Sequence, residues 1–140
     1  MYPEEIVAPC RKELTDAGVE EFKTAADVEA AMTEPNGTML VVVNSVCGCA
    51  AGSARPGVRL ALDHTAVPDR IATVFAGVDT DATAKVRSYM TGYQPSSPAI
   101  ALFKNGGLVY MMERHMIEGH EPVEIAQVLK AAFDMHCGRK

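Results

Sequence analysis

Two cysteines one residue apart, Cys47 and Cys49, are the side chains with the most evident chemistry in this sequence. They follow the apolar run Met39 to Val43 and precede a segment with helical character, so they lie at a predicted strand-to-helix junction. The first amides of a helix and its macrodipole favour a thiolate over a thiol. The order of these residues therefore predicts a redox-active dithiol.

The positions of the two thiols predict different roles for them. We expect Cys47 to be the nucleophile, because it lies nearer to the loop and to the start of the helix. Cys49 lies about half a helical turn further along, so we expect it to face partly inward and to act as the resolving thiol. Gly48, between them, permits the backbone bending that a small Cys-Gly-Cys ring requires. The sequence leaves open a second route, in which Cys47 acts alone and a second small thiol removes the adduct.

A metal or iron–sulfur carrier is an alternative use of the same cysteines. The spacing Cys-x-Cys is not the usual two-residue spacing of zinc ligands, and further ligands would have to come from Cys10, Cys137 or a distant histidine. We therefore predict no metal site. Cys10 is expected to be a passive residue on an apolar helix, whereas Cys137 is a possible auxiliary thiol.

Composition limits the class of protein. The chain has 140 residues, a net charge of −5 and four cysteines, and its pI is about 5.3. We expect a single domain over 1–140, with no nucleic-acid partner, because basic residues are not in surplus. The first twenty residues lack a long apolar stretch, so we expect no membrane segment and a cytoplasmic location. The oligomeric state stays open.

Hydrophobic patterns and turn residues predict alternating helices and strands. The run 38–44 is apolar without polar alternation, as expected of a central strand that is covered on both faces. The other expected elements are a helix over 3–18, an edge strand or a turn over 19–23, a helix over 24–32 ended by 35–37, a helix over 50–64 with a kink or a late start at 55–57, a strand over 71–78, a helix over 80–90, a hairpin of 99–104 with 108–113 and a helix that begins at Pro122.

Two expectations concern side-chain exposure. The last helix is predicted to bury one face, made of Val123, Ile125, Val128, Leu129, Ala132 and Phe133. Arg55 and Arg59 follow the thiols and are expected to face solvent, although support of the thiolate charge is the alternative.

The element order resembles a thioredoxin fold, and the segment QPSSPAIALFKNGGLVYMMERHMIEG, 94–119, resembles its second half. The resemblance implies an α/β class with a three-layer α/β/α arrangement, a mixed central sheet, a C-terminal β-hairpin and an added N-terminal helix. It also implies a cis peptide bond before Pro98. That proline would face the cysteines and present the backbone of Ser97 to an extended substrate.

A closer resemblance is to the bacilliredoxin family, and it is carried by NSVCGCAAGSARPGVRLALDH, 44–64, together with 74–106 and 113–137. It runs from Tyr2 to Cys137. The resemblance implies a thiol-disulfide oxidoreductase that removes bacillithiol from mixed disulfides on cytosolic proteins. Bacillithiol would be the co-substrate and bacillithiolated proteins the partners, with no organic cofactor.

Two other functions are alternatives to the removal of bacillithiol. One is a general disulfide isomerase or reductase that acts on other thiols, and the other is the metal carrier described above. Arg114 and His115, near the end of the hairpin, would provide a cation for the acidic groups of a bacillithiol-like ligand.

Overall fold

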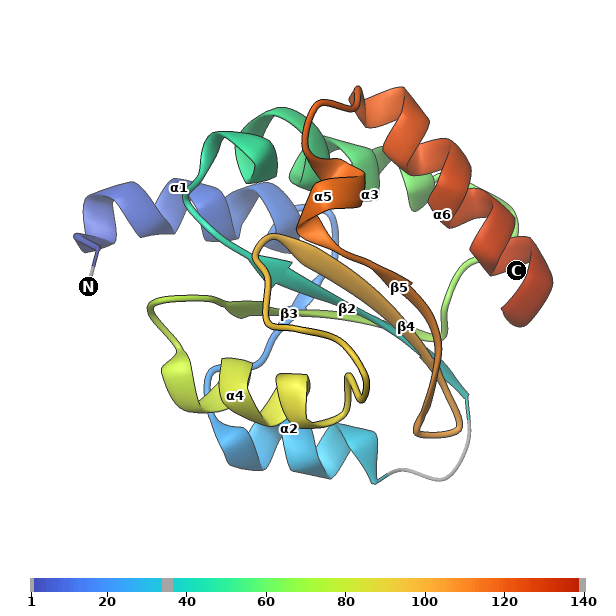
Figure 1. The fold of residues 1–140 in the computed structure, drawn as a ribbon, viewed down its shortest axis with the longest axis horizontal. Coiled ribbons are helices and arrows are strands. Elements are labelled where there is room, and N and C mark those ends of the chain that lie inside the picture. Colours follow the sequence, from blue (N-terminus) through green and yellow to red (C-terminus); the bar gives the residue numbers. More distant parts are fainter. Residues whose placement is uncertain (1, 34–36, 139–140) are drawn as a thin grey trace.

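A five-stranded mixed sheet forms the centre of the molecule, in a computed structural model that describes residues 2–33 and 37–138 (Figure 1). Its strands, in the order β1-β3-β2-β4-β5, are β1 (Glu20–Glu21), β3 (Arg70–Phe75), β2 (Thr38–Asn44), β4 (Ala99–Lys104) and β5 (Gly107–Met112). β3 is parallel to both β1 and β2, whereas β4 is antiparallel to β2 and β5. The predicted parallel pair and hairpin are confirmed, and 19–23 contains an edge strand.

The strand β2 is the innermost part of the fold, because all seven of its residues are buried. Its side chains alternate between the two faces of the sheet. Leu40 and Val42 belong to one hydrophobic cluster, whereas Val41 and Val43 belong to the other. The continuous apolar run therefore supplies both cores, as the sequence predicted.

Helices cover both faces of this sheet, which gives the expected three layers (Figure 1). One face is covered by α2 and α4, and the other by α3 and α6, with Leu14 of α1 in the same cluster as α3 and α6. The helices are α1 (Glu4–Thr15), α2 (Ala25–Met32), the π-helical turn η1 (Ala50–Ala54), α3 (Arg55–Ala61), α4 (Thr80–Ser88), α5 (Arg114–Ile117) and α6 (Pro122–His136). The sequence predicted that 35–37 ends the helix over 24–32, but positions 35 and 36 lie outside the described residues.

The helix after the cysteine pair is irregular where Pro56 was predicted to disturb it. It starts with the π-helical turn η1 and becomes α-helical at Arg55, with Pro56 in the first turn of α3. Pro56 has no N–H with which to bond the carbonyl of Gly52, and wide π-helical turns are frequent where the regular bonding of a helix is interrupted. The predicted kink is therefore a change of helix type.

The predicted buried face of α6 is wrong at two positions. Val123 is 58% exposed and Val128 is 43% exposed, whereas Ala126 is buried. The buried stripe of α6 is made of Ile125, Ala126, Leu129, Ala132 and Phe133, and it lies against the backbone of α3 at Gly57, where an added Cβ would come within 2.7 Å of Ile125. A contact this close leaves room for small and medium side chains only.

Among the described residues, none of the helices combines the length and the apolar character that are needed to cross a membrane.

Candidate functional site

The two cysteines lie where β2 ends and the irregular helix begins. The carbonyl of Cys47 accepts hydrogen bonds from the amides of Ala50 and Ala51 at 3.1 and 3.2 Å, so Cys47 stands at the start of the first helical turn. Both thiols are free and half-buried. Gly48 is exposed, and an added Cβ would meet no described heavy atom within 4 Å. With both thiols free, therefore, packing does not require a glycine at this position.

The surroundings of Cys47 favour its thiolate. Burial is the largest influence on this thiol and raises its pKa, but hydrogen bonds from the Ser45 hydroxyl and from the amides of Ala50 and Cys49, together with the charge of Arg114, lower the pKa below its ordinary value. The Ser45 hydroxyl donates to the Cys47 sulfur at 3.2 Å. Cys47 is therefore a good candidate for the nucleophile.

Cys49 has the opposite character. Burial has the largest effect on Cys49 and raises its pKa. The neighbouring Cys47 and the carboxylate of Glu118 raise the pKa further, whereas the charge of Arg114 lowers it. The nearest cationic nitrogen, Nη2 of Arg114, lies 3.8 Å from the Cys49 sulfur. Cys49 therefore holds its proton more firmly than the neighbouring Cys47 does. This asymmetry suits a resolving residue, which acts only after its neighbour has reacted.

A buried hydrogen-bond network centred on Arg55 supports the loop that carries the thiols. Arg55 is 4% exposed, so the expectation that it faces solvent is wrong. Its Nη1 donates to the carbonyl of Ser45 at 2.6 Å and to Oδ1 of Asn44 at 3.0 Å, and its Nε donates to Glu13 at 2.7 Å. Glu13 comes from α1, far away in sequence, so the pattern around Arg55 gave no signal of this partner. Arg59, by contrast, is exposed as predicted.

The segment before β4 completes the site. The peptide bond between Ser97 and Pro98 is cis, as the resemblance to thioredoxins implied. The carbonyl of Ser97 accepts a hydrogen bond of 3.0 Å from Nη1 of Arg114. Because Arg114 also reaches Cys49, it connects the Ser97–Pro98 segment with the cysteine pair. The prediction of a cation at the end of the hairpin thus identified a residue of this site.

Ser97 and Cys47 line one open groove of about 280 Å³. The other residues that line it are Tyr2, Ser45, Val46, Ala76, Gly77, Arg87 and Arg114. Sequence reasoning missed Arg87, because a basic residue in the last turn of a helix is ordinarily a solvated side chain.

The structure does not bring Cys137 to this groove. Burial raises the pKa of Cys137, and the neighbouring Thr38 side chain, which lowers it, stands at the opposite end of β2 from the cysteine pair. A strand of this length separates the two ends by about 20 Å. The thiol of Cys10 donates to the carbonyl of Ile6 in its own helix. Cys137 is therefore not placed to exchange a disulfide with Cys47 within one chain, whereas Cys10 lies nearer to the pair, since its carbonyl accepts a hydrogen bond of 3.0 Å from Nδ2 of Asn44.

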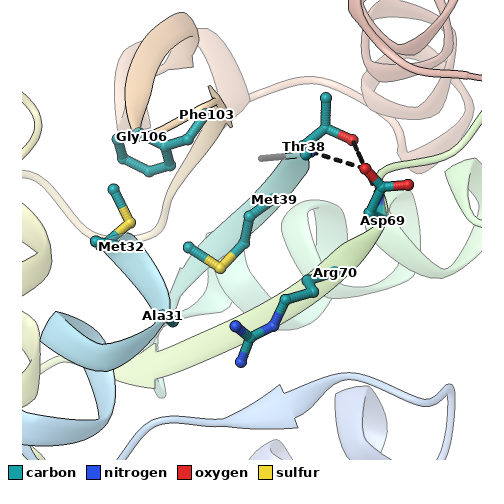
Figure 2. A pocket seen from close by; sticks show the side chains of 9 residues that line it. Ala31, Met32, Thr38, Met39, Asp69, Arg70, Phe103 and Gly106 are labelled. Atoms are coloured by element: carbon teal, nitrogen blue, oxygen red, sulfur yellow. Dashed lines mark hydrogen bonds between the residues drawn. The ribbon is translucent and has the colours of Figure 1, made fainter. Parts of the chain in front are cut away.

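A small cavity of about 40 Å³ also lies at that far end of the sheet (Figure 2). Its lining includes Met32, Met39 and Phe103, and the hydroxyl and amide of Thr38 both bond the carboxylate of Asp69 (Figure 2). Its polar groups are therefore occupied with one another. Across the part of the chain that the structure describes, no three His, Cys, Asp or Glu side chains are gathered so that they would hold a metal ion.

Comparisons with known proteins agree with this geometry. A family model described as "Disulphide isomerase" matches residues 2–137. A bacilliredoxin from Cytophaga hutchinsonii is 55% identical over 134 residues, which cover 96% of this chain and 98% of that protein. One from Koribacter versatilis is 51% identical, with 99% and 95% covered, and one from Staphylococcus aureus is 45% identical, with 98% and 94% covered.

Solved structures establish the fold. The thioredoxin of Fasciola hepatica superposes with a TM-score of 0.59 at 22% identity, over 84% of this chain and 99% of that one. Thioredoxin O2 of Arabidopsis thaliana gives a TM-score of 0.55 at 14% identity, over 84% and 96%. The predicted thioredoxin-like α/β fold is confirmed.

Proposed function

The chain belongs to the bacilliredoxin family of thiol-disulfide oxidoreductases, and from this membership we propose that it removes bacillithiol from mixed disulfides on cytosolic proteins. The observation that carries the proposal is that the pKa values of the two thiols are shifted in opposite directions. The pKa of Cys47 is lowered, whereas that of Cys49 is raised. A pair of this kind is suited to accept a thiol adduct and then to release it.

In the first step, the Cys47 thiolate attacks the bacillithiol sulfur of the mixed disulfide. A bond forms between Cys47 and bacillithiol, the disulfide bond to the substrate protein breaks, and the protein sulfur leaves as a thiolate that takes up a proton. The Ser45 hydroxyl and the amides of Ala50 and Cys49 lower the pKa of the attacking sulfur and so favour its ionised form before this step.

In the second step, Cys49 loses its proton and attacks the Cys47 sulfur. Bacillithiol leaves as a thiolate, and Cys47 and Cys49 are joined by a disulfide. Once Cys47 carries the adduct, it no longer holds the negative charge that raised the pKa of Cys49. The ionisation of Cys49 is therefore easier at the stage at which it is needed. A cellular thiol or dithiol must then reduce the disulfide. In the one-thiol route, a second bacillithiol attacks the adduct instead and leaves as bacillithiol disulfide.

The rival activity is general disulfide exchange, which the description of the matching family model favours. The open groove and the Ser97 backbone at its edge would accept extended protein segments of many sequences. The two activities share the chemistry of Cys47 and differ in the group that is transferred.

Two mixed disulfides of one carrier protein separate these activities. A protein with a single cysteine is prepared as its bacillithiol adduct and as its 2-mercaptoethanol adduct, and the release of its free thiol is followed with excess bacillithiol as reductant. We expect faster release from the bacillithiol adduct. Equal rates, together with reactivation of a protein that has scrambled disulfides, would instead establish a general isomerase or reductase.

A further inference from the structure

The groove that contains Cys47 has a positive lining in a chain of net negative charge. Arg87 and Arg114 line it, and no aspartate or glutamate is among the described residues that line it. The whole sequence carries a net charge of −5. The local excess of positive charge beside the reactive sulfur is therefore opposite in sign to the molecule as a whole.

Both arginines are held by the same short segment before Pro98. Nη2 of Arg87 donates to the carbonyl of Ser96 at 3.3 Å, and Nη1 of Arg114 donates to the carbonyl of Ser97 at 3.0 Å. The backbone amide of Arg114 donates to the Ser96 hydroxyl at 3.4 Å. The two cations thus reach consecutive residues from different elements, α4 and α5.

Arg87 has hydrogen-bonding capacity that the described residues leave unused. Its Nε is buried and has no hydrogen-bond partner, and among the described residues no carboxylate pairs with its guanidinium. Burial lowers its pKa, since no anion offsets the loss of water around its charge. A buried unpaired donor of a charged group is rare and costs free energy. Because Arg87 also lines the groove, an anion bound there would offset the uncompensated charge of its guanidinium.

Arg114 can still attract an anion although it forms an ion pair with Glu118. Its Nε lies 3.1 Å from Glu118, but both side chains are largely exposed, and an exposed ion pair of this kind contributes little free energy. A guanidinium binds a carboxylate through two parallel N–H donors, which an ammonium group does not provide.

We propose that Arg87 and Arg114 form an anion subsite that binds the carboxylates of the small-thiol half of the mixed disulfide while its sulfur is attacked by Cys47. This inference rests on the proposed function, because it gives the acidic groups of bacillithiol their place in the groove. It assigns Arg87 the role of a specificity residue. A neutral small thiol gains nothing from this subsite.

Arg87 allows a clean test, because it does not contribute to the shift of the Cys47 pKa, whereas Arg114 does. In a Cys49→Ala background, the transfer of bacillithiol and of 2-mercaptoethanol from a carrier protein to Cys47 is followed by intact mass. Arg87→Gln is compared with Lys85→Gln, which removes the same charge from the same helix where Lys85 faces Glu29 at 3.9 Å. Thermal unfolding shows that each variant is folded.

We expect Arg87→Gln to slow bacillithiol transfer about tenfold more than it slows 2-mercaptoethanol transfer, as the loss of one charge-assisted bond implies. Lys85→Gln should change neither rate. Equal slowing of the two transfer reactions, or slowing of neither, would overturn the proposed subsite.

A second readout is independent of bacillithiol. The rate of alkylation of Cys47 by iodoacetate, an anion, is divided by the rate with neutral iodoacetamide. The ratio should fall in Arg87→Gln and stay constant in Lys85→Gln. An unchanged ratio in Arg87→Gln would overturn the inference. If the wild-type protein releases no bacillithiol, the proposed function fails, and this ratio alone then decides whether the anion subsite exists.

Discussion

The hydroxyl of Ser45 is the side-chain donor closest in sequence to the reactive thiol, and its removal is the most direct perturbation of the site. It donates to the Cys47 sulfur at 3.2 Å and accepts from the Cys47 amide at 3.3 Å. Ser45→Ala deletes one oxygen and adds no volume. We expect the pKa of Cys47 to rise toward its ordinary value, because the thiolate loses a hydrogen bond that the thiol needs less.

The size of the effect follows from the partial exposure of the sulfur. A hydrogen bond to a charged group contributes about 1.5–3 kcal/mol when water cannot replace it. Cys47 is half-buried, so water restores part of the lost interaction. We therefore take a value just below this range, about 1.4 kcal/mol, which corresponds to about a tenfold change in the ionisation constant. Since a more basic thiolate is also a better nucleophile, the observed rate should fall less, about threefold to fourfold.

The assay is the rate of alkylation of Cys47 by iodoacetamide as a function of pH, with Cys49 replaced by alanine. The Ser45→Ala profile should shift to higher pH and reach an alkaline plateau at least as high as the original one. Ser53→Ala is the matched control, because the Ser53 hydroxyl bonds the carbonyl of His120 instead of the thiol. An unshifted profile would refute the role of Ser45. A loss of rate that persists in alkaline solution would show that access, and not ionisation, had changed.

Three further outcomes follow from the structure. Arg55→Met should lower the free energy of unfolding by about 3 kcal/mol in urea titrations, because it breaks a buried ionic network and leaves its acceptors unpaired. Gly57→Ala should cost about 2 kcal/mol in the same measurement, since its Cβ would lie 2.7 Å from Ile125. In wild type, alkylation followed by peptide mapping from acid to alkaline pH should modify Cys47 first, since its lowered pKa makes it a thiolate at lower pH. Cys49 should be modified at higher pH than Cys47, because its pKa is raised.

Matched variants control the two stability predictions. Glu13→Gln removes the charge opposite Arg55 at a position that is a third exposed, so its cost should be clearly smaller. Gly52→Ala adds a methyl group where no described atom lies within 4 Å of the new Cβ, and stability should be unchanged or slightly higher. Equal losses in Gly52→Ala and Gly57→Ala would contradict the packing argument, and full stability of Arg55→Met would contradict the buried network.

Features with a local cause could be predicted from the sequence. The apolar run of β2 predicts a strand that is buried on both faces, and Asn105-Gly106 predicts the hairpin turn, in which both residues have positive φ. The dithiol at the end of β2 also follows from local order. Each of these predictions depends on residues that are neighbours in the chain.

Features that depend on distant segments could not be predicted in this way. Arg55 is buried because α1 brings Glu13 to it across 42 residues. Arg87 belongs to the groove because the segment before Pro98 folds back onto α4. Val128 is exposed because the stripe of α6 that packs against α3 runs through Ile125 and leaves Val128 at its side. In each case the partner, and not the residue type, decides the role.

The central claim is that Cys47 takes the small thiol and that Cys49 then removes it. The most direct test is the mass of the protein after one turnover with a bacillithiolated carrier, with the modified residue located by peptide mapping. We predict a stable bacillithiol adduct on Cys47 in Cys49→Ala, an internal disulfide without adduct in wild type, and no adduct in Cys47→Ala. An adduct on Cys49 in the Cys47→Ala variant, formed at the wild-type rate, would contradict the account.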